Sequence, residues 1–144
     1  MNTRYFTRIA EALCLLTVAL SGMTGCGNGF VGMSGRVTYS DNGEPLETGT
    51  VTFTADMFQA RGDIKEDGKY VIGSLRDNDG LPPGTYTVFI SNAERSSGAQ
   101  DGSTTTPVKT PLIDAKYTKL ETSELRVTVD KNTKKFDFTV DRKK

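Results

Sequence analysis

The sequence holds few side chains of the types that perform acid–base or nucleophilic chemistry. Its 144 residues include no His and 2 Cys. Without His the commonest general base is missing, and so are Ser/His pairs, Cys/His pairs and every His-containing metal site. Serine and threonine are plentiful, but no local motif places a base beside one of them. Acidic residues fall mostly at outward strand positions, which does not suggest a paired-carboxylate hydrolase. We therefore expect no catalytic residue, no cofactor and no enzymatic activity.

One acidic turn has the oxygen atoms that a cation would need. Asp77, Asn78, Asp79 and Gly80 follow one another, and Ca²⁺ takes about six to eight oxygen ligands. An EF-hand pattern would then require a Glu further along the chain, but Thr87 occupies that position. An ordinary turn is the favoured interpretation, calcium binding stays open, and we predict no metal site.

Charge and glycine patterns argue against nucleic acids and nucleotides as partners. Lys and Arg number 18 and Asp and Glu number 18, so the formal net charge is zero. A nucleic-acid binder needs a basic face, so we expect no nucleic-acid partner. Residues 27–32 satisfy G-x-G-x-x-G, but a dinucleotide site needs a strand before this motif and a helix after it. Here a cleavable signal would precede the motif and a strand would follow.

Residues 1–25 have the organisation of a secretory signal. Arg4 and Arg8 give a positive beginning, and residues 12–20 form an apolar run too short to span a membrane. The run is followed by Ser-Gly-Met-Thr-Gly and then Cys26, which resembles a bacterial lipobox. The resemblance implies cleavage before Cys26 and attachment of diacylglycerol to its thiol. We expect a cell-envelope protein held to the membrane through an N-terminal lipid.

The use of cysteine agrees with this interpretation. Cys14 would leave with the signal and Cys26 would carry the lipid, so the mature domain would have no free thiol and no disulfide. Gly27, not Asp, follows the lipid-bearing residue. By resemblance to enterobacterial sorting, this favours the outer membrane, with the domain facing the periplasm or the surface.

The rest of the chain alternates apolar and polar residues with a period of two, which is typical of half-buried strands. The same alternation places Phe53 inward and Thr52 outward. One-faced strands bury their apolar sides best as two packed sheets. We therefore predict an all-β fold, a seven-stranded antiparallel Greek-key sandwich that follows an N-terminal signal helix. The predicted strands cover residues 35–39, 51–55, 60–64, 70–72, 86–90, 125–129 and 136–140.

The predicted organisation has three parts: a signal peptide over 1–25, a flexible tether over 26–32 and a sandwich domain over 33–144. Residues 92–124 break the alternation and are predicted to form a long loop. Within it, residues 94–106 contain one Ala as their only apolar residue, so we expect a mobile segment.

The second half of the long loop carries apolar side chains that could anchor it. Pro111, Leu112, Ile113 and Tyr117 are predicted to pack against the sandwich and return the chain to the strand at 125–129. Two aromatic residues are the candidate ligand contacts: Phe89, at an outward strand position, and Tyr117.

Four motifs follow one another along the chain: Gly35-x-Val37, Glu44-Pro45-Leu46-x-x-Gly49-x-Val51-x-Phe53, Asp67-Gly68-Lys69-Tyr70 and Leu81-Pro82-Pro83-Gly84-Thr85-Tyr86-x-Val88. In this order they resemble the carboxypeptidase regulatory-like domain, a family with a transthyretin-like β-sandwich related in architecture to immunoglobulin-like folds. Residues 111–125 with the two strands that follow are similar to small lipoproteins abundant in planctomycete-like bacteria. Such domains are accessory modules, so the resemblance implies a fold and no activity.

These observations lead to two hypotheses for the function. The first is a noncatalytic, lipid-anchored β-sandwich that acts as a structural or interaction module of the cell envelope, with another envelope protein as a possible partner. The alternative is a glycan- or peptide-binding module that uses the loop over 92–124.

Overall fold

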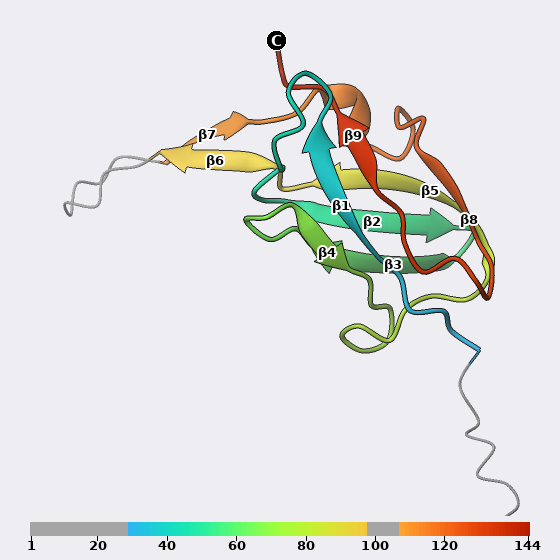
Figure 1. Ribbon diagram of the computed structural model, residues 1–144. Coiled ribbons are helices and arrows are strands. Elements are labelled where there is room, and N and C mark those ends of the chain that lie inside the picture. The colour runs from blue at the N-terminus through green and yellow to red at the C-terminus, as the bar shows by residue number, and fades with distance from the viewer. Residues whose placement is uncertain (1–28, 98–106) are drawn as a thin grey trace, which may run out of the picture.

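The computed structural model describes residues 29–97 and 107–144, and this part of the chain is all-β (Figure 1). The predicted signal segment with its helix lies outside the described residues, as does Cys26. Among the described residues, no helix is long and apolar enough to cross a membrane. The elements are β1 (Ser34–Tyr39), β2 (Thr50–Ala55), β3 (Phe58–Asp63), β4 (Lys69–Val71), β5 (Gly84–Ser91), β6 (Glu94–Ser97), β7 (Val108–Pro111), the 3₁₀ helix η1 (Ala115–Tyr117), β8 (Arg126–Val129) and β9 (Phe138–Val140).

The period-two alternation located seven of these strands correctly. Strands β1 to β5, β8 and β9 each overlap one predicted strand. Most of their inward positions are buried as the alternation requires, and Val37, Phe53 and Val88 are fully buried examples. The prediction of an all-β chain is therefore confirmed.

Two sheets face each other across the core. One has the order β4-β1-β9 and the other the order β3-β2-β5-β8. Figure 1 shows the first sheet lying over the second, with β1 and β9 crossing in front of β2 and β5. This arrangement removes the apolar side of each strand from water, which is the main force that holds two such sheets together.

The pairing of β1 with β9 is parallel, which corrects the expectation of purely antiparallel sheets. Val37 lies beside Phe138 and Tyr39 beside Val140, with both strands running in the same direction. A period of two says which side of a strand is buried but nothing about its direction. Direction is set here by the connection between β8 and β9, which carries the chain from one sheet to the other.

Aromatic rings fill the space between the sheets. The ring of Phe53, on β2, lies 6.3 Å from that of Tyr70, on β4, and 6.2 Å from that of Phe136, just before β9. A third neighbour, Tyr86 on β5, lies 6.3 Å away. Edge-on and tilted pairs at these separations are favourable because the ring edge of one meets the ring face of another. Phe53 therefore connects both sheets.

Thr52 is buried, which corrects the expectation that it is exposed. It lies between two cross-strand neighbours, Arg61 on β3 and Phe89 on β5. Directly opposite residues have closely spaced Cβ atoms, so the long side chains on either side can cover a small one between them. Only 4% of Thr52 is exposed.

The segment predicted as one long loop contains a β-ribbon, which is a third correction. Strands β6 and β7 pair antiparallel, with Glu94 opposite Pro111 and Ser97 opposite Val108. The ribbon projects from the body of the molecule (Figure 1). It escaped prediction because β7 is exposed along its whole length, so no apolar face marks it in the sequence. Residues 98–106, the rest of the predicted mobile segment, lie outside the described residues.

The chain between β7 and β8 packs on the sandwich through most of its predicted anchors. Ile113 is buried in the core, and Leu112 and Tyr117 pack against it half-buried. Pro111 is exposed instead, because it ends the projecting ribbon. The buried hydroxyl of Ser123 donates a hydrogen bond to the carbonyl of Val88 and ties this segment to β5.

The packed part of the domain begins before residue 33. Val31 exchanges two backbone hydrogen bonds with Leu81, at 2.8 and 3.1 Å, and its side chain is buried. The ring of Phe30 meets that of Phe58 edge-on at 5.8 Å. The predicted tether over 26–32 is thus shortened at its end, because residues 30 and 31 already belong to the folded domain.

Candidate functional site

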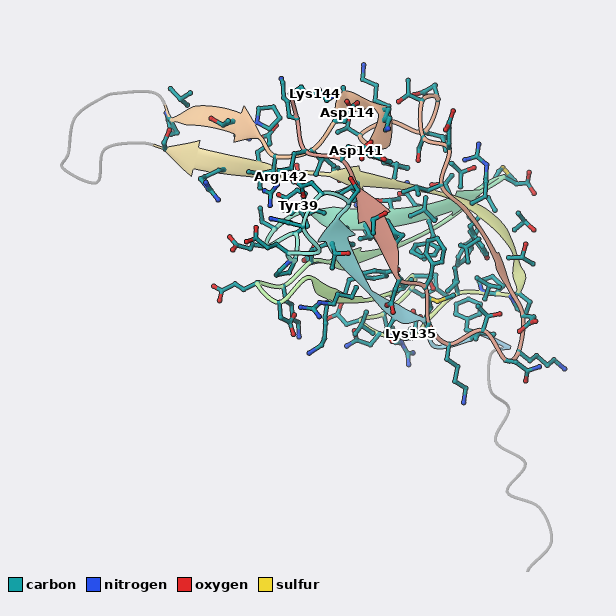
Figure 2. The ribbon with its side chains drawn as sticks, turned by 45° about the horizontal axis from the view of Figure 1, so that its top comes forward. Tyr39, Asp114, Lys135, Asp141, Arg142 and Lys144 are labelled. Atoms are coloured by element: carbon teal, nitrogen blue, oxygen red, sulfur yellow. The ribbon has the colours of Figure 1, made fainter. Side chains whose placement is uncertain are left out.

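Charged residues gather at the end of the molecule where β1 and β9 both finish. Since the two strands are parallel and in register, Tyr39 and Val140 end side by side. The residues that follow each strand therefore meet, and η1 lies against them through a hydrogen bond from the backbone of Asp114 to that of Asp141. Figure 2 shows Tyr39, Asp114, Asp141, Arg142 and Lys144 at this end. We call it the C-terminal cluster.

Arg142 is the centre of one half of the cluster. Its guanidinium carbon lies 3.6 Å from the centroid of the Tyr39 ring, a cation–π contact. Its Nε lies 3.0 Å from the carboxylate of Asp41, and a second nitrogen lies 2.8 Å from that of Glu44. Burial raises the pKa of the Tyr39 phenol above its ordinary value, so this ring is uncharged at neutral pH.

Asp141 organises the other half. One carboxylate oxygen lies 2.5 Å from Lys116 Nζ and accepts a hydrogen bond from the Tyr117 hydroxyl at 3.1 Å. The other oxygen accepts from the Ser40 hydroxyl at 2.6 Å. These bonds, that from Lys116 foremost, lower the pKa of Asp141 to about 2. Because three separate segments converge on this carboxylate, it joins the end of β1, the η1 helix and the C-terminal residues.

A shallow hollow of about 270 Å³ opens beside this cluster. Its wall combines the aromatic ring of β1 with carboxylates, guanidinium groups and two apolar side chains. The side chains of Arg142 and Glu44 form an ion pair with each other, and this pair holds both side chains in place along the wall of the hollow. The lining residues are Tyr39, Glu44, Pro45, Glu47, Arg95, Leu112 and Arg142.

In the acidic turn over 77–80, the carboxylate of Asp79 is used in hydrogen bonds to the nearby backbone. The carboxylate of Asp79 accepts hydrogen bonds from the backbone N–H groups of Ser74, Leu75 and Arg76 at 2.7–3.2 Å. The bond from Ser74 is the largest cause of a lowered pKa at Asp79. Within residues 29–97 and 107–144, no group of three or more Cys, His, Asp or Glu is arranged to hold a metal ion. Asp79 therefore has the role of a turn cap.

The structure does not bring the predicted site residues together. Phe89 is half-buried on the outer side of β5, opposite Thr52, and is not part of the hollow. Tyr117 reaches the C-terminal cluster, where its hydroxyl bonds to Asp141 and Lys116 Nζ lies 4.8 Å from its ring centroid. Tyr117 thus acts as an anchor of the loop. Cys26 lies outside the described residues.

Sequence reasoning missed the C-terminal cluster. Arg142 and its partners Asp41 and Glu44 are about a hundred positions apart in the sequence, and the pairing of β1 with β9 brings them together. The sequence offers one signal, the excess of charged residues immediately after the predicted strands 35–39 and 136–140. This signal places charges at the ends of two strands, but it does not show that these two strand ends lie side by side.

Comparison with known proteins leaves the family open. No family model matches the sequence, and no curated protein matches it either. Among solved structures, the chain is similar to the crystal structure of a 9R-lipoxygenase from Cyanothece PCC8801, at 15% identity and a TM-score of 0.38. The match covers 84% of this chain and 17% of the lipoxygenase chain.

Proposed function

We propose that this chain is a noncatalytic, lipid-anchored module of the cell envelope, attached to its membrane through Cys26. The observation that carries the proposal is the order of features before the domain. A positive beginning, a short apolar run and small residues lead to Cys26, and the packed domain begins four residues later at Phe30. An anchor this close to a folded domain suits a protein that works at a membrane surface.

The side chains of the motif residues support a structural role. Gly68 has φ +79°, and a Cβ there would lie 2.6 Å from the carbonyl oxygen of Val37, so the turn before β4 requires glycine. The Tyr70 hydroxyl donates to the Phe136 carbonyl at 2.5 Å, and that of Tyr86 donates to the Pro82 carbonyl at 2.8 Å. These residues build the fold, and we assign them no chemistry.

As part of the same proposal, we assign the domain to the carboxypeptidase regulatory-like, transthyretin-like sandwiches. Support comes from where the four resembling motifs fall. They lie in β1, before and within β2, in the turn and strand of β4, and at the start of β5. The parallel β1–β9 pair is the feature that this assignment must accommodate.

Substitution of the proposed lipid-bearing residue tests the anchor. Cys26→Ala should move the protein from the membrane fraction to the soluble fraction, or leave an uncleaved precursor. Cys14→Ala is the matched control, since it removes the other thiol from the segment that would be cleaved, and it should fractionate like the wild type. Identical fractionation and migration of Cys26→Ala and wild type would refute the proposal.

A second candidate function is peptide binding through the β6–β7 ribbon, in keeping with the expectation of a binding module that uses residues 92–124. In the described part of the chain each ribbon strand pairs on one side, so its outer edge could accept an extended peptide. Glycan arrays and panned peptide libraries on the anchored protein test this candidate. Specific binding that is lost on deletion of 96–106, but kept in Lys131→Ala, would favour it.

A further inference from the structure

The residues that begin the folded domain lie at the end of the sandwich opposite the C-terminal cluster. We call residues 30–34 the leading segment. It runs directly into β1, which begins at Ser34 and ends at Tyr39 in the cluster. Figure 1 places the C terminus at the far end from β1's beginning, and Figure 2 shows Lys135, which pairs with Ser34, away from Asp141 and Arg142.

Three turns surround the leading segment. The β2–β3 turn adjoins it through the edge-on contact between the rings of Phe30 and Phe58. The turn before β5 adjoins it at Gly80, where φ is +83° and an added Cβ would lie 2.1 Å from the carbonyl oxygen of Val31. The β8–β9 connection adjoins it through a hydrogen bond from Ser34 N to the Lys134 carbonyl at 3.1 Å.

The distance from the proposed anchor to this end is short. Cys26 precedes Phe30 by four residues, and four residues of fully extended chain span at most about 14 Å. A lipid on Cys26 therefore keeps Phe30 within about 14 Å of the bilayer surface, and it holds the three turns around the leading segment at the end of the sandwich nearest to that surface. The opposite end is separated from that surface by the length of β1 as well.

The two most exposed large apolar side chains of the described residues lie in these turns. Met57, beside Phe58 in the β2–β3 turn, is 103% exposed, and Leu75, in the turn that Asp79 caps, is 77% exposed. Single exposed apolar residues are common on proteins. Their shared position around a short lipid tether is informative, because apolar side chains held near a bilayer gain free energy by entering its headgroup–acyl boundary.

Charge at this end does not favour anionic over neutral lipid. The acidic and basic side chains of the three turns and their flanks nearly balance, and Lys135 pairs with Asp137 at 2.6 Å. Apolar insertion, and not attraction of lysines to anionic headgroups, is therefore the contact that the surface offers. The charged residues are Asp56, Arg76, Asp77, Asp79, Asp130, Lys131, Lys134, Lys135 and Asp137.

We propose that the end of the sandwich around the leading segment rests on the lipid surface that holds the anchor, with Met57 and Leu75 inserted among the headgroups. This inference depends on the proposed lipid at Cys26. The domain then stands on the membrane in one orientation, and the C-terminal cluster with its hollow points away from it.

Fluorescence quenching by lipids tests this orientation. The full chain, expressed so that its signal is processed, carries one added cysteine as Met57→Cys, Leu75→Cys or the control Leu120→Cys. Leu120 is 40% exposed and follows η1, near the cluster. Each protein is labelled with a thiol-reactive fluorophore and reconstituted in phosphatidylcholine vesicles with or without spin-labelled phosphatidylcholine, and acylation of Cys26 is measured by mass spectrometry.

We expect quenching at positions 57 and 75 to exceed that at 120 at least threefold, and to be equal in neutral vesicles and in vesicles with phosphatidylglycerol. Equal quenching at all three positions on acylated protein overturns the orientation and leaves the anchor intact. Protein that is processed without an acyl chain on Cys26 overturns the anchor and the orientation together.

Discussion

Removal of the Tyr70 hydroxyl tests the hydrogen bond that joins β4 to the segment just before β9 in the β4-β1-β9 sheet. Tyr70 is 1% exposed, and its hydroxyl donates to the Phe136 carbonyl at 2.5 Å. Tyr70→Phe keeps the ring in place but leaves that carbonyl without this donor. Loss of a buried hydrogen bond with its acceptor left behind costs about 1–3 kcal/mol. With a slope of about 2 kcal/mol per molar urea, the midpoint of unfolding should fall by about 0.5–1.5 M.

A pH series gives this prediction a second readout. Burial raises the pKa of Tyr70 far above its ordinary value. A raised pKa in the folded state means a contribution to stability that is complete below about pH 10, the pKa of an unfolded tyrosine, and is lost as the pH rises further. The free energy of unfolding should therefore fall above pH 10 in the wild type and less steeply in Tyr70→Phe.

The matched control is Tyr117→Phe. Its hydroxyl bonds to Asp141 at 3.1 Å on a half-buried side chain, so the expected loss is below about 1 kcal/mol. A change of less than about 0.5 kcal/mol in Tyr70→Phe, or an alkaline slope identical to that of the wild type, would refute the assigned role of this hydroxyl.

Three further perturbations test the core, the cluster and the leading segment. Phe53→Ala should cost about 3–5 kcal/mol in urea unfolding, because it opens a cavity among three rings, while Thr52→Ala should cost about 1 kcal/mol; equal losses would mean that the register of β2 is wrong. The lowered pKa of Asp141 should stabilise the fold above about pH 4, with the contribution lost as the pH falls toward 2, and Asp141→Asn should flatten that acid slope in pH-dependent thermal melts. Gly80→Ala should cost about 1–3 kcal/mol through its positive φ and its clash with Val31, and it should speed hydrogen exchange at the Val31 amide; unchanged exchange would contradict the packing described for the leading segment.

Most of the strands could be predicted because burial of one side of a strand requires apolar residues at every second position. A strand with one apolar side alternates whatever its neighbours are, and this signal located β1 to β5, β8 and β9. The signal is absent where both sides of a strand face water. For this reason the β6–β7 ribbon was mistaken for an irregular loop.

Pairing between distant segments could not be predicted from local pattern. The parallel β1–β9 ladder joins residues about a hundred positions apart, and it brings the chain that carries Arg142 alongside Tyr39. Thr52 is similarly buried by side chains of the neighbouring strands β3 and β5. The surroundings of Phe89, which is half-buried opposite Thr52, likewise depend on strands that the alternation does not order; its role as a ligand contact stays a prediction.

The central claim is that Cys26 carries the membrane anchor, and mass spectrometry of the processed protein tests it most directly. Protein extracted from membranes of a bacterial host should begin at Cys26. Its mass should exceed that of residues 26–144 by diacylglycerol on the thiol, with or without a further acyl chain on the new amino terminus. A processed chain that begins at any other residue, or that carries a free thiol at Cys26, would contradict the account.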